Sequence, residues 1–508
     1  MKKLLFILLM FPASLWSQNY NITIKLDKPS DDLLYIGQHF RDELVVLDSA
    51  KRQGNSYVFK GRRKWDTGIY ALIHQDKKKS FSDFTIDGSQ KFSLHFDSTL
   101  SPEGVSVKGC PANSAMFAFL ARDSWARSQA NDINKRKKSS DAAVKAQAEK
   151  DFDKLSDEMV NYQNQMMDKY RHFFFFQLQK MFESPDVPDS IQDKACYYRT
   201  HFWDGVDFND PRLKRTPGFF NKMNLFFFGI LYHADADTIC RHADLLISRF
   251  ENDSSMMRYF LDFIMPKYYR STKNIGWDQV WCYLVHRFYE PNRSGFAYPG
   301  DISSKVKQAQ FLEKSLIGAM GAELFMADTN QSPNANDWIS SHRFPNKYVI
   351  LWFWDPDCHH CQEQTATLIS LYDSLSRSGN KPFEVYAVGY ESDVAKWKKY
   401  VRQHNLPFVN VGGNNVNIDY QEAYNVHGAP TMIILNADRQ IIMNKTIPTS
   451  SILPFISEYE RLHPEQANRP PSRWQQIGAS LWGIEGYNGL SRPRTPIVHD
   501  EGAHPTTH

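Results

Sequence analysis

Two closely spaced cysteines mark the part of the chain most able to do chemistry. Cys358 and Cys361 follow an apolar run that ends at Trp354, and His359 and His360 stand between them. If a helix begins at Cys358, its free N–H groups and positive dipole end stabilise a thiolate there and lower the pKa of that thiol below its ordinary value of about 8.5. The two histidines can add charge or hydrogen bonds that favour the thiolate. The spacing therefore predicts a nucleophilic Cys358, with Cys361 one helical turn away.

Such a pair predicts thiol–disulfide exchange. The Cys358 thiolate attacks a substrate disulfide to give a mixed disulfide, and Cys361 then attacks Cys358 and releases the reduced product. A zinc site would need a second pair of ligands with local spacing, and none accompanies His359, His360 and His404. A merely structural disulfide rarely lies where a strand turns into a helix. We therefore expect no metal and no cofactor other than the redox-active cysteine pair itself.

A second motif lies some seventy residues further along the chain. Ala429-Pro430-Thr431 precedes the apolar run Met432 to Leu435, which is typical of a strand. Proline is tolerated at the opening of a strand. A cis Ala429–Pro430 bond would leave the backbone of Ala429 free to pair with an extended substrate segment beside the sulfurs. We therefore expect Ala429, Pro430 and Thr431, together with Trp354, His359 and His360, to shape the substrate-binding site.

The elements around the cysteines follow an alternating pattern. The continuous apolar run from Tyr348 to Trp354 predicts a strand buried on both faces. Leu368, Leu371, Tyr372 and Leu375 then mark one face of a helix, and Val385 to Tyr390 predicts the next strand. Strand, helix and strand in this order predict a parallel pair with a helical crossover, hence an α/β domain.

The length of the chain predicts further domains. At 508 residues and roughly 150 residues per domain, about three domains are expected. Alternating apolar residues and the turn pairs Gly54-Asn55 and Asp87-Gly88 predict a small β domain at 18–112. Long segments rich in Ala, Lys, Glu, Gln and Met predict an all-α domain at 113–312. The α/β domain is expected at 313–465, before a polar, proline-containing tail at 466–508 that we expect to be flexible.

Composition excludes several classes of protein. Lys and Arg number 60 against 57 Asp and Glu, so the chain lacks the strong positive charge expected of a protein that binds nucleic acid. Six cysteines in this length exclude a disulfide-dense scaffold. The pairing of the other four, Cys110, Cys196, Cys240 and Cys282, cannot be read from their spacing, and buried free thiols are an equal alternative to two disulfides.

The first residues predict export from the cytoplasm. Lys2 and Lys3 precede the apolar run from Leu4 to Phe11, and a small residue, Ser17, follows at a plausible cleavage point. This pattern is typical of a secretory signal peptide at 1–17, because the apolar run is far shorter than the ~20 residues that span a bilayer. We therefore expect a soluble protein in the periplasm or outside the cell, where disulfide chemistry is possible.

The α/β domain resembles the thioredoxin-like thiol–disulfide oxidoreductases of the bacterial envelope, the group related to cytochrome c maturation reductases. The resemblance rests on Leu316-Ile317-Gly318, the strand ending in Phe353-Trp354, the Cys358/Cys361 pair, and Gly428-Ala429-Pro430-Thr431 before a strand. It implies a thioredoxin fold, Cys358 as nucleophile, Cys361 as resolving thiol and Pro430 as cis-proline. The β domain and the helical domain are similar to domains of unknown function that precede such modules in secreted multidomain proteins.

Several positions depart from the pattern that this resemblance implies. Gln364 and Ala366 stand where many of these reductases have glutamate and proline, and Trp352 stands where thioredoxins have a buried aspartate. Glu363 is one residue off the expected position, so on a helix it points about 100° away. His360 matches strongly oxidising family members, which often have histidine before the second cysteine. Peroxiredoxin chemistry is not expected, because Asp355 stands where those enzymes have threonine.

These observations predict a secreted enzyme that exchanges disulfides with envelope proteins, as a reductase or isomerase. Its expected partners are protein thiols and disulfides, and a membrane electron-transfer protein that restores its redox state; nucleic acid is not among them. The alternative is a non-catalytic binding protein that uses the thioredoxin fold as a platform. In that case the β and helical domains would recognise an envelope partner or a peptide.

Overall fold

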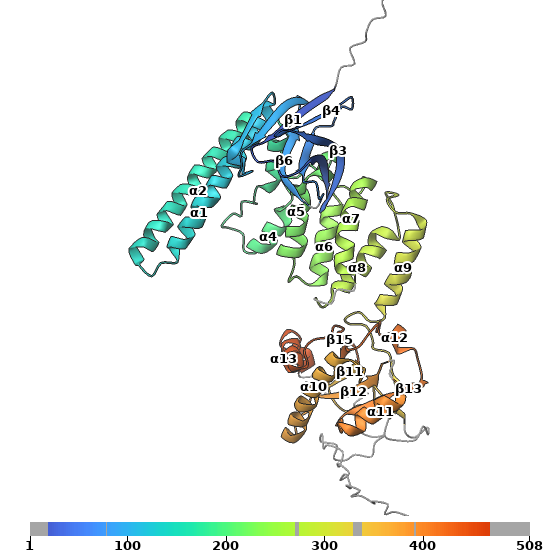
Figure 1. The fold of residues 1–508 in the computed structure, drawn as a ribbon. Helices are drawn as coiled ribbons and strands as arrows, with labels where there is room; N and C mark the ends of the chain where they lie inside the picture. The colour runs from blue at the N-terminus through green and yellow to red at the C-terminus, as the bar shows by residue number, and fades with distance from the viewer. Residues whose placement is uncertain (1–18, 78, 270–273, 329–337, 391–392, 468–508) are drawn as a thin grey trace, which may run out of the picture. The chain divides into compact units, whose positions relative to one another are not determined.

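The computed structural model describes residues 19–77, 79–269, 274–328, 338–390 and 393–467. The predicted signal peptide at 1–17 lies outside the described residues, as does the predicted tail from residue 468 onward. The described part, drawn as a ribbon in Figure 1, divides by its internal contacts into two compact units. The first contains the described residues up to Ala234 together with His242–Tyr259, and the second contains Asp235–Arg241 and the described residues from Phe260 onward.

The predicted β domain is confirmed as a half-barrel sheet with strand order β6-β5-β2-β3-β4-β1-β7-β8. Its strands are β1 (Tyr20–Leu26), β2 (Leu33–Phe40), β3 (Glu43–Gln53), β4 (Ser56–Gly61), β5 (Gly68–Ile73), β6 (Ser80–Ile86), β7 (Lys91–Phe96) and β8 (Val105–Lys108). Alternate residues of β1 and β7, such as Ile22, Ile24 and Leu94, are buried in one core. Neighbouring strands run antiparallel except β1 and β7, which are parallel.

The predicted helical region is also confirmed. It contains α1 (Pro111–Lys137), α2 (Ala142–Tyr170), α3 (Phe174–Gln179), α4 (Lys194–His201), α5 (Pro217–Leu225), α6 (Ala236–Ile247), α7 (Ser254–Tyr268), α8 (Trp277–Leu284) and α9 (Pro299–Glu313). Proline opens α1, α5 and α9, where its missing N–H is no loss. Asp141 caps α2 by accepting from the N–H groups of Ala143 and Val144. These four helices therefore begin at residues whose local chemistry favours a helix start.

The C-terminal α/β domain has a seven-stranded sheet of order β10-β9-β13-β12-β11-β14-β15. Its elements are β9 (Phe325–Asp328), β10 (Trp338–Ser340), β11 (Tyr348–Trp354), α10 (His359–Ser378), β12 (Phe383–Gly389), α11 (Val394–Gln403), β13 (Val409–Val416), α12 (Tyr420–Ala423), β14 (Thr431–Leu435), β15 (Ile441–Met443), α13 (Ile452–Leu462) and α14 (Pro464–Ala467). Strands β11 and β12 are parallel and α10 connects them, which confirms the predicted crossover. Strand β14 pairs antiparallel with β11 on its other side.

Strand β11 is buried on both faces, as its apolar sequence predicts. Ile350, Trp352 and Trp354 pack in one core with residues of α10, α11 and α13. Leu351 and Phe353 point to the opposite face and pack in a second core, which includes residues of β9 and β10. Because side chains alternate along a strand, two such cores hold β11 in one register. The chain leaves β11 from this fixed position.

A buried arginine links two loops of the same domain. The Arg439 guanidinium is fully buried and donates to the carbonyl oxygens of His342 at 3.1 Å, Phe344 at 2.6 Å and Asn436 at 3.1 Å. Burial lowers the pKa of Arg439 to about 10, so the side chain stays charged at neutral pH. Its hydrogen bonds therefore join the loop that precedes β11 to the turn between β14 and β15.

We expect Arg439→Met to lower the free energy of unfolding of this domain by about 2–4 kcal/mol, because buried carbonyl oxygens lose their donors. Urea unfolding of the full chain, followed by tryptophan fluorescence, measures the change. Arg343→Met is the matched control, because Arg343 is exposed and lies 3.9 Å from Glu323; an exposed pair contributes at most about 1 kcal/mol. Equal stability of the two variants would contradict the structural role of Arg439.

Candidate active site

The two cysteines lie where β11 leads into α10. Cys358 is the N-cap residue of α10, and the Cys361 N–H donates to the Cys358 Sγ at 3.2 Å. The Cys358 carbonyl accepts from the Gln362 N–H at 3.1 Å, which begins the regular helix. The first-turn N–H groups and the helix dipole favour negative charge on the Cys358 sulfur. The local fold thus gives this sulfur the environment of an anion-binding helix start.

Cys358 and Cys361 form a disulfide, with their Cα atoms 5.2 Å apart. Their exposure differs, because Cys361 is fully buried whereas Cys358 is only partly buried. An incoming thiol or disulfide can therefore reach the Cys358 sulfur more easily than the Cys361 sulfur. This asymmetry suits Cys358 to react with substrate and Cys361 to react within the protein.

The loop before β14 lies against the Cys358 sulfur. The Ala429–Pro430 peptide bond is cis, and the Ala429 carbonyl oxygen lies 3.7 Å from the Cys358 Sγ. Thr431 donates through its hydroxyl to the Gly428 carbonyl at 2.7 Å, which closes the loop locally. The structure thus brings Ala429, Pro430 and Thr431 beside the cysteines, although they lie some seventy residues apart in the chain.

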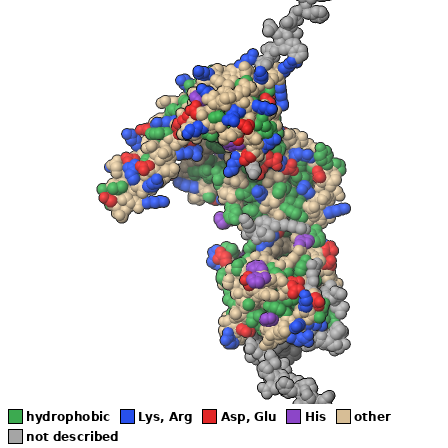
Figure 2. Space-filling view, viewed as in Figure 1, with side chains coloured by type: hydrophobic (Ala, Val, Ile, Leu, Met, Phe, Trp, Pro, Cys, Tyr) green, Lys and Arg blue, Asp and Glu red, His purple; other side chains and the backbone are tan. Residues whose placement is uncertain are grey.

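The side chains of the two histidines are exposed. The side chains of His359 and His360 are 85% and 61% exposed, and each Nδ1 lies 3.6 Å from a carboxylate oxygen of Glu363. Neither imidazole hydrogen-bonds to a sulfur within the part of the chain that the structure describes. Figure 2 shows histidine side chains at the surface of this domain. The carboxylate of Glu363 therefore offsets positive charge that these histidines could bring to the site.

The positions that depart from the reductase pattern have other partners. The Trp352 indole N–H donates to the Thr365 hydroxyl at 3.1 Å inside the core. The Gln364 side-chain oxygen accepts from the Thr449 N–H at 2.9 Å. Trp354, which we expected to shape the site, packs edge-on against Tyr400 with ring centroids 5.3 Å apart. Trp352 and Gln364 thus connect α10 to β11 and to the segment that contains Thr449.

Sequence reasoning missed one residue of the site, Thr446. Its hydroxyl donates to the Pro430 carbonyl at 3.0 Å and accepts from the Met432 N–H at 3.3 Å. Thr446 comes sixteen residues after Pro430 and belongs to no motif. Thr446 lies beside Pro430 because the chain turns after β14 and β15 runs back along that strand. Its place in the site could have been found only by predicting this turn correctly.

The other four cysteines form no disulfide in the described residues. Cys110, Cys240 and Cys282 are buried, and Cys196 is exposed. Burial raises the pKa of Cys110 and raises that of Cys282 to about 12, so both thiols stay protonated at neutral pH. Of the two alternatives left open by their spacing, the structure shows free thiols at Cys110, Cys196 and Cys282.

The described residues contain neither a metal-binding cluster nor a membrane-spanning helix. No three His, Cys, Asp or Glu side chains converge in a way that could hold a metal ion. None of the described helices is long and apolar enough to cross a membrane. Over the face visible in Figure 2, basic and acidic side chains are interspersed.

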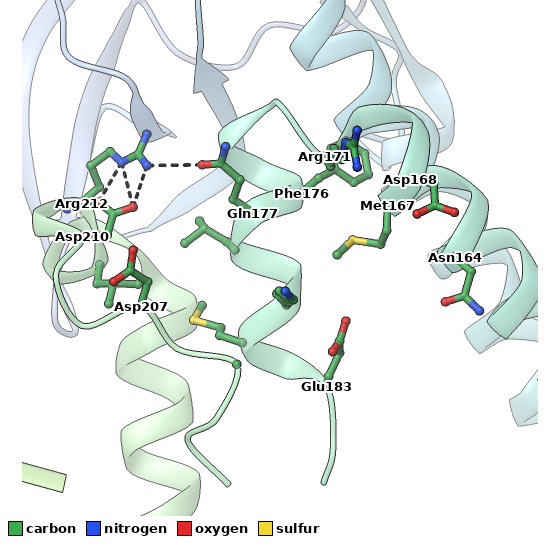
Figure 3. A pocket seen from close by; sticks show the side chains of 15 residues that line it. Asn164, Met167, Asp168, Arg171, Phe176, Gln177, Glu183, Asp207, Asp210 and Arg212 are labelled. Carbon is green, nitrogen blue, oxygen red and sulfur yellow. Dashed lines mark hydrogen bonds and ion pairs between the residues drawn. The ribbon is translucent and has the colours of Figure 1, made fainter. Parts of the chain in front are cut away.

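A cavity of about 750 Å³ lies in the first unit, between the end of α2, helix α3 and the segment 205–213 (Figure 3). Its apolar lining includes Met167 and Phe176, and charges of both signs surround it, including Arg171. Arg212 is neutralised by Asp210, to which it donates at 2.7 Å. Acidic and basic side chains thus line the cavity together.

Two family models match parts of the chain. Residues 346–441 match the family described as Thioredoxin-like, and residues 140–294 match the Domain of unknown function (DUF5106). No curated protein matches the chain. The DUF5106 match falls within the helical region, and the other match begins just before β11 and ends at the start of β15.

Several solved structures are similar to part of the chain. A thioredoxin-like protein from Bacteroides caccae is 18% identical, with a TM-score of 0.43, and the match covers 55% of this chain and 98% of that one. A domain of a possible thiol-disulfide isomerase from Cytophaga hutchinsonii is 25% identical, with a TM-score of 0.26 and coverage of 29% and 96%. The thioredoxin domain of a thiol-disulfide oxidoreductase from Bacteroides vulgatus is 19% identical, with a TM-score of 0.24 and coverage of 28% and 96%.

The family match coincides with the strand, helix and strand that carry the cysteine pair, and with the strand that follows Pro430. The fold observed there is the α/β arrangement that the sequence predicted. The C-terminal part of this multidomain chain is therefore a thioredoxin-like domain.

Proposed function

We propose that the protein exchanges disulfides with envelope proteins through Cys358 and Cys361, as a reductase or isomerase outside the cytoplasm. The observation that carries this proposal is the position of the Cys358 sulfur. It lies at a helix N-terminus, is partly exposed, and faces the Ala429 carbonyl beside a cis-proline. The thioredoxin-like domain supports a redox role in general. The predicted signal peptide supports the extracytoplasmic location.

In the reductive direction both cysteines begin as thiols. The Cys358 thiolate attacks one sulfur of a client disulfide, so a Cys358–client bond forms and the other client sulfur leaves as a thiolate, which takes up a proton. The Cys361 thiol then loses its proton, and its sulfur attacks Cys358. This step closes the Cys358–Cys361 disulfide and releases the second client thiol. Two electrons pass to the client, and a membrane electron-transfer partner would return the cysteines to thiols.

The surroundings of the histidines favour the reducing direction. A strongly oxidising pair needs its reduced form stabilised, which a positive imidazole against the Cys358 sulfur would do. Here His359 and His360 are exposed and both lie near the Glu363 carboxylate. Water therefore screens the charge of these histidines, and the Glu363 carboxylate offsets it. The histidines thus contribute little to the stability of a thiolate at Cys358.

We expect Cys361→Ala to trap client proteins as mixed disulfides on Cys358, because the thiol that resolves them is absent. The adducts are recovered from cells by affinity purification of the variant and separated under non-reducing conditions. The double variant Cys358→Ala/Cys361→Ala is the control and should recover none. If the single variant yields no adducts and the unaltered protein does not reduce insulin, the enzyme proposal fails and the binding-platform alternative is favoured.

We also expect the Cys358/Cys361 couple to have a reduction potential near the −270 mV of thioredoxin rather than the −120 mV of a strong oxidant. Equilibration against a glutathione series, with the fraction of disulfide measured at each ratio, gives the value. His360→Ala should leave the potential nearly unchanged, since its imidazole does not contact a sulfur. A potential close to −120 mV would assign the protein to oxidation of client thiols instead.

A further inference from the structure

One short segment after β15 connects three parts of the second unit. We call residues 444–449 the connecting segment. Lys445 forms an ion pair with Asp278 of α8. Thr446 bonds to the Pro430 carbonyl and to the Met432 N–H. Thr449 bonds to Gln364 of α10, one turn beyond Cys361. Three residues of this segment therefore contact the helical region, the cis-proline loop and the helix that begins at Cys358.

The ion pair at the helical end is buried. The side chains of Asp278 and Lys445 are only 6% and 12% exposed, and the second carboxylate oxygen of Asp278 has no hydrogen-bond partner among the described residues. Asp278 lies in the first turn of α8, where the helix dipole favours an anion. Removing one partner of such a pair leaves an uncompensated charge in a poorly hydrated position, which is strongly unfavourable. The pair therefore holds Lys445 in place far more firmly than an exposed pair would.

Neighbouring contacts attach the same part of the helical region to the thioredoxin-like domain. The Asn444 side-chain amide donates to the Ser315 carbonyl at 2.9 Å. The Gln279 side-chain amide, one residue after Asp278, donates to the Ile317 carbonyl at 2.8 Å. The Gly318 N–H in turn donates to the Ile441 carbonyl of β15 at 2.8 Å. Helix α8 is thus attached to the edge of the sheet from which the connecting segment leaves.

Further along the connecting segment, Thr446 contacts the cis-proline loop of the candidate active site. The Thr446 hydroxyl bonds to groups on both sides of Thr431, namely the carbonyl of Pro430 and the N–H of Met432, at 3.0 and 3.3 Å. The residue before Pro430 supplies the carbonyl that lies 3.7 Å from the Cys358 sulfur. A shift of Thr446 would therefore change the position of the cis-proline loop relative to that sulfur.

We propose that Asp278 is a positioning residue for the redox site, acting through Lys445 and Thr446 to hold the cis-proline loop beside Cys358. This inference rests on the proposed function. It gives α8, within the part of the helical region that matches a domain of unknown function, a role in the recognition of polypeptide clients. Asp278 touches neither the sulfurs nor the loop, so its effect is on geometry and not on the chemical step.

The two kinds of substrate should respond differently to a loosened loop. A polypeptide disulfide must place its backbone along the loop beside Pro430, and a mobile loop has to be ordered before such pairing is possible. A small disulfide needs only access to the Cys358 sulfur. Loss of the Asp278 contact should therefore slow exchange with polypeptides and spare exchange with small molecules.

The test compares rate constants of the reduced full-length protein with insulin and with 2-hydroxyethyl disulfide. In Asp278→Asn, which keeps the size of the side chain, the rate constant for insulin is expected to fall about 2- to 30-fold, and that for the small disulfide to change less than about twofold. Lys445→Met breaks the pair from the other side and should give the same selective loss. If the Asp278→Asn protein does not fold, the Lys445→Met protein decides the test.

A double-mutant cycle tests the route through Thr446. If Asp278 acts through Thr446, Asp278→Asn/Thr446→Val should be no slower with insulin than Thr446→Val alone, whereas independent effects would multiply. Lys314→Met is the matched control: it breaks the exposed pair between Lys314, which follows α9, and Glu422 of α12, and should alter neither rate. The proposal is overturned if the rate constants for both disulfides fall equally, or if the rate constant for insulin does not fall. It is also overturned if the effects of the two substitutions on the insulin rate constant multiply in the cycle. An unaltered protein that reacts with neither disulfide instead overturns the proposed function.

Discussion

The burial of β11 on both faces is the constraint on which the candidate site depends. Seven consecutive residues, Tyr348 to Trp354, are buried, and their alternate side chains belong to two different cores. If the register of this strand shifted by one residue, the side chains that now pack in one core would point into the other. The chain therefore leaves the sheet at a fixed point, and Cys358 becomes the N-cap of α10. The same strand pairs with β14, so the loop that contains Pro430 ends beside that cap.

The cysteine pair and the strand, helix and strand around it could be predicted because their signals are local. Apolar residues over 348–354 predict a buried strand, and the residues of β11 agree with that run at both ends. The proline before Met432 to Leu435 likewise predicts the opening of a strand, and β14 begins one residue after Pro430. In each case the residues that decide the structure are neighbours in sequence, so propensity and periodicity carry enough information.

The contacts that hold the site together could not be predicted in this way, because their partners are far apart in the chain. Asp278 and Lys445 are separated by 167 residues, and Gln364 and Thr449 by 85. An aspartate in the first turn of a helix is ordinary, and a lysine after a strand is ordinary too. Their burial as a pair follows only from how α8 meets the edge of the sheet. The exposure of His359 and His360 could not be predicted either, since the sequence alone allowed both side chains to face the Cys358 sulfur.

The physical boundary of the redox module differs from the boundary of the family match. The match ends at residue 441, before Lys445, Thr446 and Thr449. These residues connect β15 to α8, to the cis-proline loop and to α10. A domain cut between α9 and β9 would remove Asp278 and leave Lys445 without its buried partner, in a segment that also contacts Pro430. Helix α8 therefore belongs, by its contacts, to the same compact unit as the cysteines. A residue that lies outside the thioredoxin-like match can in this way help to determine the geometry at Cys358.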